Sequence, residues 1–161
     1  MSILLCSGAN AQTDNGYSLD EYTELRARAD ASYAHVEHAR EGTNRHQALV
    51  ETAIEDRIAL VRYLGAWTRS GTLPDEMEES AYETRIVLYQ NIIALNVAVG
   101  NCSDARSMVD RMEQIVEENG ETSMTDDALA EANTDALHCG NTEMVTHRAT
   151  WARCSWEQVR C

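Results

Sequence analysis

Apolar residues recur at intervals of three and four along most of the chain, which is the period of an amphipathic helix. The clearest stripe lies in a helix predicted to be capped by Thr43 or Asn44 and to run to about Arg69. Its apolar positions are Val50, Ile54, Ile58, Val61 and Leu64. An earlier helix is predicted to open with a capping box at Ser18 and Glu21 and to run to about Glu41. Because its apolar face is thin, we expect it to be an outer helix.

A third helix is predicted from Pro74, and its second half is apolar on every side. No charged residue occurs over residues 86–103. A membrane span needs about 20 predominantly apolar residues, whereas Gln90, Asn91 and Asn96 interrupt this shorter run. We therefore predict no membrane span and interpret the segment as a central helix surrounded by the others.

Shorter amphipathic runs predict three more helices, over residues 101–118, over 126–138 with Thr125 as its cap, and from Asn141 or Thr142 onward. Five predicted helices are each followed by a glycine, and these are Gly42, Gly71, Gly100, Gly120 and Gly140. Glycine after the last turn is typical of antiparallel helices on tight connections. The fold is therefore predicted to be all-α, with about six helices stacked as antiparallel hairpins in a short right-handed solenoid or an irregular bundle.

One predicted hairpin, over residues 89–106, carries a recognisable set of large and small residues. Gly100 occupies its turn, and Ala105 supplies a small residue in its second helix. Tyr89 and Ile92 supply large residues in its first helix. In these positions the hairpin resembles a tetratricopeptide-type helical repeat, and the resemblance covers roughly the last half of the chain. The resemblance implies a concave surface that binds peptides or protein segments and has no chemistry of its own.

The N-terminal residues differ from the rest of the chain. Residues 3–6 are like the end of an apolar signal region, and residues 9–11 fit the small-residue pattern that precedes a cleavage site. We interpret residues 1–11 as the remnant of a secretory signal peptide, with an ordinary N-terminal tail as the alternative. No linker divides residues 12–161, which are predicted to form a single helical domain of an exported, bacterial protein at a periplasmic, cell-surface or extracellular location.

The cysteines support export. Of the five cysteines, all but Cys6 follow the signal-like segment, and these four are Cys102, Cys139, Cys154 and Cys161. An even set in an exported protein implies two disulfides, with three possible connectivities. Cys102 and Cys139 each lie within two residues of a glycine that ends a predicted helix. If those glycines mark equivalent corners of stacked hairpins, these two sulfurs can meet, and the other two cysteines would pair. The alternative is a reduced cytosolic protein.

Charge limits the classes of partner. The formal net charge is −14, and every Lys or Arg position is an arginine. Such a chain repels nucleic acid and anionic membranes, since both are bound by clustered basic residues. We expect a protein or peptide partner, and the negative potential favours a basic one. The missing lysine fits a GC-rich genome or adaptation to salt. No catalytic or nucleotide motif stands out, so we expect neither an enzyme nor a cofactor.

Four amides are the candidate partner-binding residues. A buried amide without a hydrogen bond costs about 1–3 kcal/mol, so Gln90, Asn91 and Asn96 are expected either to bond between helices or to line a groove. Asn133, in the fifth predicted helix, would face the same groove. Asparagine and glutamine side chains suit the binding of an extended peptide backbone.

Three histidines form the densest set of metal-type ligands. His35 and His38 share a helix face, and His46 begins the next helix and could fold back across Gly42. Together they could bind zinc or copper, although exposed histidines beside arginines are the alternative explanation.

The leading hypothesis is an exported, non-enzymatic helical-repeat module for protein–protein binding or assembly. One alternative is a structural subunit of a periplasmic or cell-surface assembly. The other is a helical-bundle metal-binding protein that uses the three histidines. The oligomeric state is left open.

Overall fold

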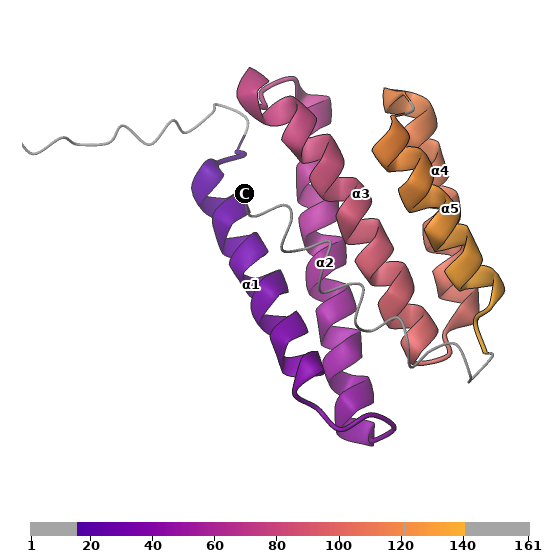
Figure 1. Ribbon diagram of the computed structural model, residues 1–161. Coiled ribbons are helices and arrows are strands. Elements are labelled where there is room, and N and C mark those ends of the chain that lie inside the picture. The colour runs from indigo at the N-terminus through magenta and orange to yellow at the C-terminus, as the bar shows by residue number, and fades with distance from the viewer. Residues whose placement is uncertain (1–15, 121, 141–161) are drawn as a thin grey trace, which may run out of the picture.

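A computed structural model describes residues 16–120 and 122–140, which form helices and contain no strand. The helices are α1 (Leu19–Glu37), α2 (Asn44–Ser70), α3 (Asp75–Ala98), α4 (Cys102–Asn119) and α5 (Ser123–Leu137). Figure 1 shows α1, α2 and α3 side by side as an antiparallel row, with α4 and α5 beyond α3. The predicted all-α class is confirmed. The sixth predicted helix lies outside the described residues, and the right-handed solenoid stays a prediction.

Helix α3 is the centre of the packing. It contacts α2, α4 and α5, whereas among the described helices α1 packs only against α2. The prediction of a central third helix is therefore right for three neighbours and wrong for α1, which is an outer helix as expected. Helices α2, α3 and α4 supply the largest fully buried apolar side chains, which are Trp67, Leu60, Leu64, Ile86, Leu88, Ile92, Ile93, Met112 and Val50. No helix of the described segments is long and apolar enough to cross a membrane.

A glycine follows each of the described helices as predicted, and Gly71 and Gly120 are the C-caps of α2 and α4. The five glycines that follow predicted helices all have positive φ angles, between 67° and 93°, and are Gly42, Gly71, Gly100, Gly120 and Gly140. Side chains rarely adopt this left-handed conformation, so glycine ends a helix there at little steric cost. The first helix is shorter than predicted, because α1 ends at Glu37 rather than about Glu41. The Arg40 carbonyl accepts a hydrogen bond from the Thr43 hydroxyl (2.9 Å), which stabilises a turn in place of further helix.

The N-terminal caps follow the sequence signals with two corrections. The predicted capping box at Ser18 and Glu21 is only half formed, because Ser18 accepts the Glu21 N–H but its own N–H donates to the Tyr63 hydroxyl. Ser18 caps α1 and Thr43 caps α2, each through a side-chain oxygen that accepts a backbone N–H. Thr125 is not the cap of α5, as the sequence predicted, because Thr122 occupies that position. Thr125 instead lies in the first turn, and its fully buried hydroxyl accepts a hydrogen bond from the Thr122 N–H (2.8 Å) in a reciprocal capping box.

A disulfide joins the first residue of α4 to the second residue after α5. Cys102 and Cys139 are bonded, with their Cα atoms 5.4 Å apart. Gly140 lies beside the bond, since a Cβ placed on it would stand 3.8 Å from the Cys102 sulfur. The predicted meeting of these two cysteines at neighbouring hairpin corners is confirmed. Cys154 and Cys161 lie outside the described residues.

Polar contacts attach α1 to α2. The Arg57 guanidinium is 2% exposed, donates to the Ala29 carbonyl (3.0 Å) and lies over the Tyr33 ring, 4.4 Å from its centroid. Burial lowers the pKa of Arg57 from its usual value. Near the start of α1, the Tyr63 hydroxyl accepts from the Ser18 N–H (2.7 Å) and donates to the Ser18 carbonyl (2.9 Å). These contacts hold α1 against α2 at the start of α1 and further along it.

Candidate functional site

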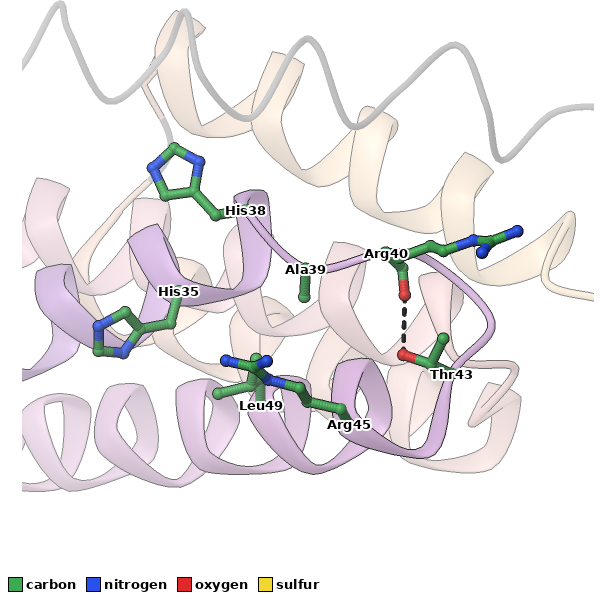
Figure 2. A pocket seen from close by; sticks show the side chains of 7 residues that line it. All are labelled: His35, His38, Ala39, Arg40, Thr43, Arg45 and Leu49. Atoms are coloured by element: carbon green, nitrogen blue, oxygen red, sulfur yellow. Dashed lines mark hydrogen bonds between the residues drawn. The ribbon is translucent and has the colours of Figure 1, made fainter.

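The connection between α1 and α2 encloses a surface hollow of about 460 Å³. It is lined by the last turn of α1, the connecting residues and the first turns of α2 (Figure 2), namely His35, His38, Ala39, Arg40, Thr43, Arg45 and Leu49. Four of the seven lining residues carry a basic side chain and none carries a carboxylate. Two of these four residues are arginines, which carry the positive charge, since histidine is counted as neutral in the net charge of −14.

Thr43 sets the shape of the hollow. Its side-chain oxygen accepts the His46 N–H (3.1 Å) and its hydroxyl donates to the Arg40 carbonyl (2.9 Å), so one residue caps α2 and closes the turn. Gly42, with φ of 73°, lets the chain reverse just before this cap. The first turn of α2 contains no acidic residue, so the positive end of its helix dipole adds to the local positive potential.

The basic side chains spread over the hollow rather than meeting at one point. In Figure 2, His35 and Arg45 extend in one direction along the helices, Arg40 extends in the opposite direction, and His38 points away from α2. Arg40 and Arg45 are both exposed. Guanidinium groups placed apart in this way can pair with successive carboxylates, whereas a small ion would reach one of them at a time.

The three histidines predicted as metal ligands are not gathered by the structure. His35 and His38 line the hollow, but His46 does not and is 9% exposed. Within residues 16–120 and 122–140, no group of three or more His, Cys, Asp or Glu side chains is placed to hold a metal ion. The structure therefore places His35 and His38 at the hollow and His46 outside its lining.

The predicted partner-binding amides lie in the packing of α3, α4 and α5. The Gln90 amide donates to the Ala128 carbonyl (3.5 Å) and the Asn96 amide to the Ile92 carbonyl (2.9 Å). Asn133 donates to the Glu113 carboxylate (3.3 Å), and the Asn91 side chain is 4% exposed. These contacts give the amides a packing role, and their part in binding a partner stays a prediction.

Sequence reasoning finds the histidines of the hollow but not its two arginines. The available signal was local charge, because residues 35–46 hold three histidines and two arginines in an otherwise acidic chain. Glu37 and Glu41 in the same segment obscure that signal, yet neither lines the hollow. No protein-family model, curated protein or solved structure matches this chain.

Proposed function

We propose that this chain is a non-enzymatic helical module that binds a protein partner, and that an acidic segment of the partner docks in the hollow at the α1–α2 connection. The observation that carries the proposal is the lining of the hollow, which combines Arg40, Arg45 and two histidines with no carboxylate. Charge-assisted hydrogen bonds from guanidinium to carboxylate are among the stronger polar contacts in proteins.

The dimensions of the hollow support a protein segment as its occupant. Its basic groups are spread over a volume of about 460 Å³, and Ala39 and Leu49 add apolar lining between them. An extended or helical segment with carboxylates and an apolar side chain would contact both kinds of surface at once. Clusters of arginine recognise acidic segments in several peptide-binding domains.

The charge of the partner follows from two separate observations. The whole chain is strongly negative, which favours a partner with a basic surface. Arg40 and Arg45 give the lining of the hollow positive charge and no carboxylate, and the neighbouring Glu41 offsets part of that charge. We therefore propose a partner that presents an acidic segment to the hollow while the rest of its surface is neutral or basic.

The cellular location is part of the same proposal. A Cys102–Cys139 disulfide supports a function in an oxidising compartment, because structural disulfides persist outside the reducing cytosol. We propose an exported, bacterial protein at the periplasm, the cell surface or beyond.

The proposal predicts that removing the two arginines weakens binding of an acidic probe. A short fluorescent glutamate–leucine peptide is titrated against the wild type and against an Arg40→Gln/Arg45→Gln variant. Two exposed ion pairs together contribute about 0.4–2 kcal/mol, so the variant is expected to bind roughly 2- to 30-fold more weakly. Both arginines are exposed, so the variant is expected to keep its fold.

A matched variant controls for the change in net charge. Arg106→Gln/Arg111→Gln removes two exposed arginines from α4, and its affinity for the peptide is expected to stay near that of the wild type. An equal loss in both variants, or no loss in the first, would contradict docking at the hollow.

A further inference from the structure

Two arginines meet at the opposite end of α2 from the hollow, over a glycine inside the helix. If Gly65 carried a Cβ, that atom would stand 3.3 Å from Arg69 Nη1 and 3.4 Å from Arg85 Nη2. Arg69 comes from the last turn of α2, and Arg85 comes from α3. The absence of a side chain at Gly65 therefore leaves the space in which both guanidinium groups lie.

Within residues 16–120 and 122–140, neither arginine has an acidic partner at ion-pair distance. Arg85 is 8% exposed, and its buried Nε has no hydrogen-bond acceptor among the same residues. The Glu118 carboxylate acts on Arg85 through space, but it accepts its hydrogen bond from the Gln114 amide (2.8 Å).

The positive charges of Arg69 and Arg85 are only partly compensated within the described residues. Burial lowers the pKa of the Arg85 guanidinium, and the neighbouring positive charge of Arg69 lowers it further, while Tyr89, Glu118 and Tyr82 oppose that effect. A buried charge is normally retained only where a partner compensates its desolvation. Glycine inside a helix is also less favourable than alanine. Gly65 therefore lowers the stability of α2 but leaves room for the two guanidinium groups.

We propose that Arg69 and Arg85, lying over Gly65, form a binding site for an oxyanion group, either a carboxylate or a phosphate. Planar guanidinium forks match the oxygen atoms of both groups, and two guanidinium groups that lie beside the same residue can bind one anion together. Arg69 is exposed, so the site is reached from solvent. This anion site is separate from the hollow, because it uses different residues at the other end of α2.

The test measures stabilisation of the wild-type chain by small anions. Thermal unfolding is followed against increasing inorganic phosphate or acetate, with sodium chloride holding the ionic strength constant. The midpoint temperature is expected to rise with phosphate and to saturate, as linkage requires for a ligand that binds the folded state. A comparable rise with acetate would identify a carboxylate as the group recognised, and a rise with phosphate alone would identify a phosphate.

Two substitutions locate the effect. Gly65→Ala places a methyl group at the point where the guanidinium groups meet, and only the ends of flexible side chains need to move to admit it. Because alanine favours helix, this variant is expected to fold at least as stably as the wild type while binding the anion at least tenfold more weakly. Arg69→Gln is expected to show the same loss, whereas Arg106→Gln on α4 is expected to bind like the wild type. A midpoint that responds no more to phosphate and acetate than to chloride, or an equal response in all variants, would overturn the site.

Discussion

Replacing Trp67 with alanine is expected to lower the free energy of unfolding by about 3–5 kcal/mol. The Trp67 side chain is 2% exposed and is among the largest fully buried side chains of α2. Its ring lies 5.8 Å from that of Tyr63 and 6.4 Å from that of Tyr17, measured between centroids. Truncation would leave a cavity where α1, α2 and the residues before α1 meet. Urea denaturation followed by circular dichroism measures the change.

Trp67→Phe is the matched control. The indole Nε1 is buried and has no hydrogen-bond partner within the described residues, so phenylalanine removes ring area but breaks no hydrogen bond. It is expected to lose less than half as much stability as the alanine variant. Equal losses in the two variants, or an alanine variant as stable as the wild type, would show that this aromatic cluster is not part of the core.

Removing the Cys102–Cys139 disulfide is expected to cost about 4 kcal/mol. The two cysteines are separated by 37 residues, and closing a loop of that length restricts the unfolded chain by about this amount in the chain-entropy model. The double substitution Cys102→Ser/Cys139→Ser is compared with the oxidised wild type by urea denaturation. The bond attaches the C-terminal end of α5 to the start of α4, so the loss should appear first as weaker protection of α5 amides in hydrogen exchange.

A reducing agent provides the control for this variant. It should lower the stability of the wild type toward that of the serine variant and leave the variant itself nearly unchanged. A serine variant that unfolds at the wild-type urea concentration would mean that the bond does not form in the protein, and it would remove the support that the bond gives to export.

Most of the fold could be predicted because its signals are local. Ser18 and Thr43 cap helices as their sequence contexts indicate, and glycines with positive φ follow them. The uncharged run over residues 86–103 correctly indicated a helix with neighbours on several sides. The start of α5 was misplaced because Thr122 and Thr125 are both threonines able to cap a helix, and only the completed box shows which one precedes the first turn.

The candidate site was harder to predict because it depends on tertiary placement. Arginine is usually a solvent-exposed residue, so a sequence gives no reason to separate Arg57 and Arg85, which are buried, from Arg40 and Arg45, which are exposed. The hollow exists because α1 stops early and Thr43 closes the turn. These tertiary features bring together basic side chains from α1, the connection and α2.

The two positive regions of the molecule differ in geometry and therefore in the ligands proposed for them. Arg69 and Arg85 lie beside the same residue, Gly65, which suits a single oxyanion. Arg40 and Arg45 are spread around a broad hollow with apolar lining, which suits a protein segment. They occupy opposite ends of α2, so each can be removed without touching the other.

Backbone amide NMR with the glutamate–leucine peptide tests the central claim most directly, because amide shifts report where the peptide binds as well as whether it binds. The account predicts that shifts at fixed ionic strength concentrate in residues 35–49 and disappear from that segment in the Arg40→Gln/Arg45→Gln variant. Shifts that leave residues 35–49 unaffected, or that persist there unchanged in the variant, would contradict docking of an acidic segment at the α1–α2 hollow.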